Sequence, residues 1–216
     1  MSERLTTQVP PATIQRLPIY LRCLLQAETD RMPVISSGEI AAMSGTNAAQ
    51  VRKDLSFLGE LGTRGVGYDV QEMIGHFSRV LGVTEHRRVA LVGFGKLGGA
   101  LLGYTGFKER GFQIVAVFDS DPAKIGTESR GLTVLPIDDL EEVLKAEDVE
   151  ILIITTPAAA VQAVADRAVA AGIKAILNMA PTGINAPDDV TVRQVCISTD
   201  LQVLSFHLAR QGDSTE

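Results

Sequence analysis

Three glycines are spaced as G-x-G-x-x-G at Gly93, Gly95 and Gly98, directly after a run of four apolar residues. In a strand–turn–helix unit the first glycine permits a tight turn, the second lets a pyrophosphate approach the backbone, and the third lets helix and strand pack closely. The free N–H groups at the start of the next helix, at Lys96 and Leu97, would then receive the phosphates. The pattern alone predicts either a phosphate-binding turn or a nucleotide-free domain in which the glycines only turn the chain.

An acidic residue follows the next predicted strand at the position that a ribose would reach. Asp119 ends the strand expected over 113–118 and lies 26 residues after Gly93. A carboxylate there accepts hydrogen bonds from the adenine ribose and repels a 2′-phosphate. The strand, glycines, helix and acid together favour a nucleotide site, with NADH and NAD+ preferred over the phosphorylated cofactor.

Thr155, Thr156 and Pro157 follow a later predicted strand. Ligands of doubly wound sheets bind at the carboxyl ends of the strands, so this tripeptide is a candidate second wall of the nucleotide site. A simple cap for the following alanine-rich helix explains the same residues equally well.

The placement of the histidines argues against hydride-transfer catalysis. Such an enzyme needs a general acid or base beside the nicotinamide, usually His, Lys or Tyr. His76, His86 and His207 fall in a predicted linking helix, at a domain boundary and in the last predicted helix. None falls on a strand-end loop. The sequence therefore disfavours an NAD-dependent oxidoreductase, and it assigns no catalytic residue.

Residues 36–58 have the pattern of a helix-turn-helix. Ser36 and Glu39 form a capping-box sequence, in which the serine caps a short helix and the glutamate reaches back. After a glycine-containing turn, Thr46 or Asn47 caps a second helix that runs to about residue 58. Two short helices joined in this way are typical of DNA-binding domains.

The second helix of this pair carries polar side chains on its expected outer face, and a glycine-rich turn follows it. The outward side chains are of types that reach base edges and phosphates: Asn47, Gln50, Arg52 and Lys53. Residues 62–68 resemble a hairpin wing, whose Arg64 could enter a minor groove, and Arg16 could reach the DNA backbone. The alternative is an amphipathic helix with a solvated polar face.

From Arg88 onward, short apolar strands alternate with helices, which predicts a doubly wound parallel sheet and an α/β fold. Strands are expected at 89–92, 113–118, 132–135, 151–155, 175–178 and 191–196, and helices at 97–107, 138–146, 158–171 and 200–210. Before Arg88, a helix is expected to begin near Leu17, because Pro18 suits a first turn, and a linking helix is expected at 70–81. We therefore expect a winged-helix domain over 1–85, a Rossmann domain over 86–198, and a C-terminal helix and tail over 199–216.

Composition sets broader limits on the 216-residue chain. Its 45% apolar and 21% charged residues exclude wholesale disorder. The net charge of −6 argues against nucleic acid only at first sight, because residues 1–85 hold 8 basic and 9 acidic residues whereas 86–216 hold 12 and 17. Cys23 and Cys196 are too few for a disulfide framework or a thiolate metal site, and their apolar neighbours predict core positions. Without a secretion signal or a membrane-length apolar run, we expect a soluble, cytoplasmic protein with no membrane partner.

The chain closely resembles the Rex family of bacterial redox-sensing transcriptional repressors from about residue 10 to residue 210. The matching stretches include RLPIYLR (16–22), NAAQVRKDLSFLGELGTRGVGY (47–68), VALVGFGKLGGALLGYTGF (89–107) and VAVFDSDPAKIG (115–126). The resemblance implies a homodimer of winged-helix and Rossmann domains with the C-terminal helix exchanged between subunits. It also implies a palindromic operator as the DNA partner. It further implies that NADH releases the repressor from the operator, and that NAD+ competes with NADH without releasing the repressor. A nucleotide-binding scaffold without DNA affinity is the rival to this interpretation.

The resemblance also assigns residues. The DNA contacts of the family match Arg16, Arg52, Lys53 and Arg64. Its cofactor site matches Gly93, Gly95, Lys96, Gly98 and Asp119. Ile197 matches an apolar residue that reaches the nicotinamide pocket of the partner subunit. Tyr104 is expected at the cofactor site and also matches part of a switch found in some members. In that switch Arg22 matches the arginine, but Cys196 stands where the family has an aspartate, so the switch cannot operate identically.

Overall fold

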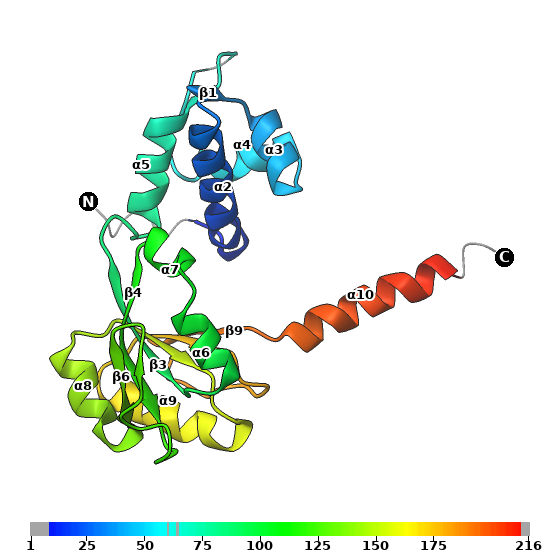
Figure 1. Ribbon diagram of the computed structural model, residues 1–216. Helices are drawn as coiled ribbons and strands as arrows, with labels where there is room; N and C mark the ends of the chain where they lie inside the picture. Colours follow the sequence, from blue (N-terminus) through cyan, green and yellow to red (C-terminus); the bar gives the residue numbers. More distant parts are fainter. Residues whose placement is uncertain (1–8, 60, 64, 213–216) are drawn as a thin grey trace. The chain divides into compact units, whose positions relative to one another are not determined.

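The computed structural model describes residues 9–59, 61–63 and 65–212 (Figure 1). The chain divides between Glu85 and His86 into two compact units. The first unit is mostly helical, and the second is built on a twisted sheet. The α/β fold class expected from the sequence is confirmed.

In the described part of the first unit, four helices pack around one apolar core. Its elements are α2 (Pro11–Thr29), β1 (Val34–Ile35), α3 (Ser37–Ser44), α4 (Ala48–Ser56), β2 (Tyr68–Asp69) and α5 (Val70–Val80). Tyr20 and Leu24 of α2, Val51 of α4 and Phe77 of α5 are buried together in that core. This packing fixes α3 and α4 as a helix-turn-helix on a platform formed by α2 and α5 (Figure 1).

The helix α2 begins six residues earlier than the sequence predicts, at Pro11 instead of near Leu17. Pro18 therefore lies in the helix interior, where its missing N–H and its ring cost about 3 kcal/mol. Leu17, Tyr20 and Leu24 are buried on one face of the helix, and burying each large apolar side chain contributes roughly 1.5–3 kcal/mol. The gain from burial exceeds the cost of the proline, so the helix continues through it.

Local side-chain chemistry sets the ends of α3 and α4, as predicted. Ser36 accepts a hydrogen bond from Glu39 N (3.2 Å), and the Glu39 carboxylate accepts one from Ser36 N (2.7 Å), which completes the capping box. Gly45 ends α3 with φ +70°, a conformation that favours glycine. Asn47 Oδ1 then accepts from Gln50 N (2.8 Å) and starts α4.

The glycine-rich turn predicted as a wing, residues 62–68, leads into β2, which pairs antiparallel with β1, the strand that precedes α3 and α4 in the chain. Val34 and Ile35 of β1 pair with Asp69 and Tyr68 of β2, and a further bridge joins Thr63 to Gly67 near the tip.

The second unit is a seven-stranded sheet in which six strands run parallel. Its strands are β3 (Arg87–Val92), β4 (Phe112–Asp119), β5 (Glu128–Ser129), β6 (Leu132–Pro136), β7 (Ile151–Ile154), β8 (Ala175–Asn178) and β9 (Thr191–Gln194), in the spatial order β5-β6-β4-β3-β7-β8-β9. Only β5 is antiparallel to its neighbour. The six parallel strands have the 3-2-1-4-5-6 order of a dinucleotide-binding sheet, and the order reverses between β3 and β7.

Helices cover both faces of this sheet (Figure 1). Side chains from α8 (Leu140–Ala146) and α9 (Val161–Ala170) pack on one face, and those from α6 (Lys96–Leu102) and α7 (Gly106–Glu109) pack on the other. The sequence predicts one continuous helix over 97–107. The structure instead breaks it at 103–105, so α6 and α7 are separate short helices.

The last helix, α10 (Ile197–Gly212), is longer than expected. Its side chains from Ile197 to Arg210 are all exposed, although Ile197, Leu201, Leu204 and Leu208 recur at helical spacing. Exchange of this helix between subunits stays a prediction. Cys196, just before the helix, is half-buried and contacts the Ser198 hydroxyl (3.1 Å), so its predicted core position is wrong, whereas Cys23 is buried as predicted.

Candidate nucleotide cleft and DNA-binding surface

A cleft of about 530 Å³ lies at the carboxyl ends of the strands, at the point where the strand order reverses. The register is level at this edge, because Val92 of β3 pairs with Phe118 of β4 on one side and with Ile154 of β7 on the other. The residues that directly follow Val92, Phe118 and Ile154 line the cleft. They are Gly93, Asp119 and Thr155. The other lining residues are Val92, Gly95, Ser120, Asp121, Lys124, Ile137, Thr156, Pro157, Ala160, Ala163, Val164 and Arg167.

The glycine turn is tied to the loop after β7. Gly93 has φ +103°, and the Thr155 hydroxyl donates to its carbonyl oxygen (2.7 Å). An added Cβ on Gly98 would overlap that same carbonyl, so this glycine lets α6 pack against the turn. A Cβ on Gly95 would meet no atom within 4 Å, which leaves the backbone open on the cleft side.

Asp119 is held by three donors of the protein itself. Its carboxylate accepts from Phe94 N (2.7 Å), Asp121 N (2.9 Å) and Lys124 Nζ (3.1 Å). Burial alone would raise the pKa of Asp119, but these hydrogen bonds outweigh burial and lower the pKa below its usual value. The cleft therefore presents an ionised carboxylate at neutral pH.

The cleft also contains a polar atom that the protein leaves without a partner. The Thr156 hydroxyl is buried and makes no hydrogen bond with any residue that the structure describes. A buried polar group without a partner is costly, and a ligand that supplies one removes that cost. The carboxylate of Asp119, the open backbone at Gly95 and this hydroxyl together suit the ribose and phosphate groups of a dinucleotide.

Five of the residues expected at the cofactor site do not line the cleft within one chain: Lys96, Leu97, Gly98, Tyr104 and Ile197. Gly98 lies behind the turn. Tyr104 follows the break after α6, where its ring packs edge-on against Phe107 and its hydroxyl accepts from Arg110 (3.2 Å). Tyr104 lines a separate hollow of the second unit, so within a single chain it lies outside the cleft, and its expected role at the cofactor site stays a prediction.

In the first unit, the expected DNA-contacting residues have different surroundings. Arg52 and Lys53 are exposed on α4, as expected, and Arg52 Nη1 donates to Ser37 Oγ (3.1 Å). Asn47 is exposed, but its side-chain oxygen caps α4. The Gln50 side chain donates to Asp54 (3.0 Å), so its expected outward position is wrong.

The hollow between α4 and the wing has a volume of about 780 Å³, and its lining includes Ser37, Arg52 and Thr63. Arg64, expected at the wing tip, lies outside the described residues.

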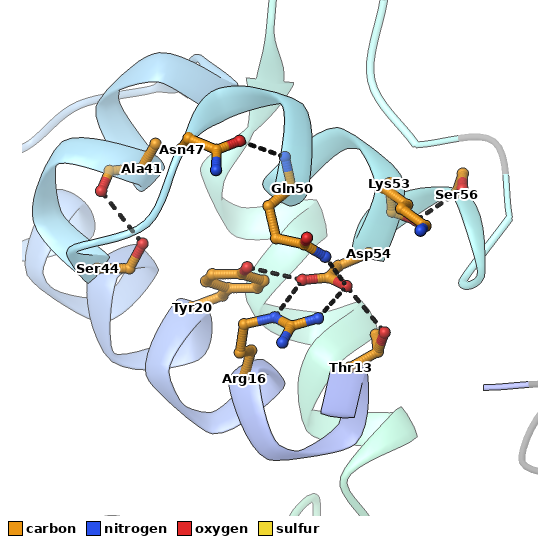
Figure 2. Close-up of polar contacts among 10 residues, drawn as sticks. All are labelled: Thr13, Arg16, Tyr20, Ala41, Ser44, Asn47, Gln50, Lys53, Asp54 and Ser56. Carbon is orange, nitrogen blue, oxygen red and sulfur yellow. Dashed lines mark hydrogen bonds and ion pairs between the residues drawn. The ribbon is translucent and has the colours of Figure 1, made fainter. Parts of the chain in front are cut away.

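A buried carboxylate whose partners the sequence does not reveal connects α4 to α2. Asp54 is 0% exposed and accepts from Thr13, Arg16, Tyr20 and Gln50 (Figure 2). Arg16, expected at the DNA backbone, forms a two-pronged ion pair with it through Nε (2.6 Å) and Nη2 (2.7 Å). Burial raises the pKa of Asp54, but hydrogen bonds from Arg16, Tyr20, Thr13 and Gln50 outweigh it and lower the pKa to about 2.

The described residues contain no cluster of His, Cys, Asp and Glu side chains suited to a metal ion. Within the same residues, no helix combines the length and the apolar character that crossing a membrane requires.

Comparison with known proteins decides the family. Models of two sequence families match: "Putative DNA-binding protein N-terminus" over residues 8–56 and "CoA binding domain" over 84–182. The redox-sensing transcriptional repressor Rex of Carboxydothermus hydrogenoformans is 50% identical over 203 residues, which cover 94% of this chain and 98% of the relative. The chain belongs to the Rex family. The Rex protein of Streptomyces griseus is 48% identical over 94% of this chain and 81% of its own length.

Solved structures of a Rex-family repressor, RSP, have the same fold. RSP in complex with β-NAD+ and operator DNA is 34% identical, with a TM-score of 0.89 and coverage of 94% of each chain. RSP in complex with β-NADH is 33% identical, with a TM-score of 0.84 over 94% of this chain and 96% of that one. The predicted Rex resemblance is confirmed, and the chain is a Rex-family repressor rather than an oxidoreductase.

Proposed function

We propose that this chain binds a palindromic operator as a homodimer and that NADH bound in the cleft of the second unit releases it from DNA. One observation carries the proposal: a single chain joins a winged helix-turn-helix to a dinucleotide cleft with an ionised carboxylate. RSP, which shares the fold, has been solved both with β-NAD+ and operator DNA and with β-NADH.

In the cleft, Asp119 would accept hydrogen bonds from the hydroxyls of the adenine ribose, and Thr156 would find its missing partner on the ligand. A 2′-phosphate would meet the negative charge of Asp119, which favours NADH and NAD+ over their phosphorylated forms. The backbone at Gly95 would lie along the pyrophosphate. Lys96 and Leu97 would offer backbone N–H groups to the phosphates, and Pro157 would form part of the wall.

On the first unit, hereafter the reader unit, Arg52 and Lys53 would contact phosphates and bases from the exposed face of α4. Asn47 would approach DNA at the start of the same helix, and Arg64 would contact DNA from the wing. Because the first unit carries almost no net charge, affinity would come from these few cations and from the two-fold symmetry of a dimer.

The apolar residues of α10 provide the argument for a homodimer. Ile197, Leu201, Leu204 and Leu208 are each more than half exposed and lie on one side of the helix. A second copy of the chain would bury this stripe, and Ile197 would then reach the nicotinamide pocket of that copy. Operator binding would place the dimer in the cytoplasm.

The release of DNA requires that NADH bind one domain arrangement more tightly than the other. NADH and NAD+ differ at the nicotinamide, because reduction adds a hydride and removes the positive charge. A dry pocket lined by Ile197 disfavours an unpaired charge, so it would prefer the neutral ring. If the NADH-favoured arrangement moves the two wings out of register with the half-sites, DNA affinity falls.

A fluorescence-anisotropy titration tests the proposal. The wild-type protein first selects a palindromic duplex from a random pool, and NADH or NAD+ is then added to the complex. NADH should lower DNA affinity more strongly than NAD+, and Asp119→Asn should reduce the NADH effect while leaving DNA binding intact. Equal effects of the two cofactors would refute redox-dependent release. Unchanged binding by the double variant Arg52→Ala, Lys53→Ala would refute the assigned DNA surface.

A further inference from the structure

Three donors on one face of α2 converge on a single carboxylate of α4. Thr13, Arg16 and Tyr20 recur at helical spacing, and all three donate to Asp54 (Figure 2). Oδ1 accepts from Thr13 Oγ1 (2.8 Å), Arg16 Nη2 (2.7 Å) and Gln50 Nε2 (3.0 Å), and Oδ2 accepts from Arg16 Nε (2.6 Å) and Tyr20 Oη (2.8 Å). A carboxylate with five donors has no capacity left for another partner.

Arg16 differs from Thr13 and Tyr20, the other donors of α2, because it is only partly enclosed. The Arg16 side chain is 28% exposed, whereas Asp54 is fully buried. Its Nε and Nη2 are both directed to Asp54, and within the described part of the chain its Nη1 makes no hydrogen bond. The guanidinium is planar, so fixing one edge on a carboxylate also fixes the direction of the remaining N–H groups.

The ion pair lies where Gln50 of α4 also binds Asp54, and the free Nη1 points away from that carboxylate (Figure 2). Gln50 binds the same Asp54 oxygen as Arg16 Nη2, and Gln50 follows the Asn47 cap by one turn. In a helix-turn-helix, the N-terminal residues of the second helix face the base edges, and the phosphate backbone passes next to them. Arg16 therefore lies next to the part of α4 along which a phosphate would pass, with Nη1 as the group available to contact it.

On the basis of the DNA-binding function proposed above, we propose that Asp54 is a positioning residue, which holds one edge of Arg16 so that Nη1 meets a phosphate of the operator. Asp54 itself touches no DNA. Gln50 is bound to the same carboxylate and contributes no base reading.

The salt dependence of operator binding tests the positioning role, because it reports phosphate contacts and not fold stability. Each lost phosphate contact lowers the slope of log K against log[salt] by about 0.9, so Arg16→Gln in both subunits should lower it by about 1.8. At 0.1 M salt this corresponds to a loss of affinity of roughly 60-fold, which should disappear as salt approaches 1 M. Arg31→Gln removes the same charge from an exposed site beyond the far end of α2 and should leave the slope unchanged.

A double-mutant cycle then separates positioning from a general structural effect. Asp54→Asn should weaken operator binding in the wild-type background and add less than 2-fold in the Arg16→Gln background. Where Asp54→Asn does not fold, Tyr20→Phe takes its place, since it removes one donor to the same carboxylate and keeps the ring. Binding is measured on the duplex selected by the wild-type protein, with NADH affinity as a check that the second unit, hereafter the sensor unit, is intact.

An unchanged salt slope for Arg16→Gln would overturn the proposal, and so would a further loss of 2-fold or more when Asp54→Asn is added to Arg16→Gln. A wild-type protein that selects no duplex would instead refute the proposed function itself, so the two failures are distinguishable.

Discussion

Replacing Gly98 with alanine should destabilise the sensor unit and weaken NADH binding. The new Cβ would overlap the carbonyl oxygen of Gly93 and would lie 3.0 Å from its carbonyl carbon and 3.1 Å from Thr155 Oγ1. The overlapping atom is backbone, so no side chain can rotate away to make room. Either α6 must move off the sheet or the glycine turn must deform, and both changes alter the cleft.

Gly99→Ala provides a matched control for the magnitude. Its Cβ would make only an ordinary contact, 3.7 Å from the Phe94 ring. Both substitutions gain about 1 kcal/mol of helix propensity, so that gain cancels in the difference between them. Overpacking costs roughly 1–3 kcal/mol, and a backbone overlap belongs at the upper end of that range. We expect the two variants to differ by about 3 kcal/mol.

Differential scanning calorimetry measures this difference as the melting temperature of the sensor unit. At about 2–4 °C per kcal/mol, Gly98→Ala should melt roughly 6–12 °C below Gly99→Ala. Calorimetric titration with NADH should show reduced affinity for Gly98→Ala and near wild-type affinity for Gly99→Ala. If Gly98→Ala melts at or above Gly99→Ala, the assigned contact between α6 and the glycine turn is wrong.

Three further outcomes are expected. Asp119→Asn removes the charge that faces the cofactor ribose while Lys124 stays at the cleft, so NADH affinity should fall at least 10-fold and the preference for NADH over NADPH should narrow. Calorimetric titration with both cofactors measures this, with Asp188→Asn, at an exposed site away from the cleft, as the control; an unchanged preference would contradict it. The destabilisation caused by Asp54→Asn should depend on pH. The pKa of Asp54 is about 2 in the folded protein against an ordinary value of 3.8, so its charge stabilises the fold by about 2 kcal/mol above pH 4. This stabilisation is lost as pH falls towards 2. Urea unfolding at pH 7 and pH 2.5 should therefore show a smaller gap between wild type and variant at the lower pH, and a constant gap would show that the charge is not the cause. Gly67→Ala should destabilise the reader unit more than Gly65→Ala, because both glycines have positive φ but only at Gly67 would a Cβ approach a backbone atom, Ile35 O at 2.9 Å. Thermal melting compares the two variants, and equal losses of melting temperature would exclude this contact as the cause.

The features that could be predicted from sequence depend on residues close together in the chain or on the regular geometry of a parallel sheet. The capping box of Ser36 and Glu39 and the Asn47 cap follow from side chains that reach their own backbone within three residues. Gly93 and Asp119 come together because the ends of adjacent parallel strands meet at one edge. These rules need no knowledge of how helices pack.

The features that could not be predicted depend on packing between distant segments. Asp54 lies three residues after Val51 and four before Leu58, so its spacing places a carboxylate on the buried face of α4. Its partners come from α2, 34–41 residues away, and sequence spacing does not reveal that Arg16 engages it. The same packing favours helix formation through Pro18. The break at 103–105 between α6 and α7, which includes Tyr104, also differs from the continuous helix that the sequence predicts over 97–107.

The hydrogen bonds of Thr155 to Gly93 and of Asp119 to Phe94 have a kinetic consequence. They hold the turn in shape through contacts within the protein, so cofactor entry needs no loop to be ordered first. Preorganised sites avoid the entropy of ordering on binding, and without a slow closure step association approaches the rate at which correctly oriented encounters occur. Association is then not the slow step, so we expect the fraction of clefts that hold NADH to adjust to a new NADH concentration on the timescale set by cofactor dissociation. Dissociation would then determine how quickly transcription responds to a change in the NADH pool.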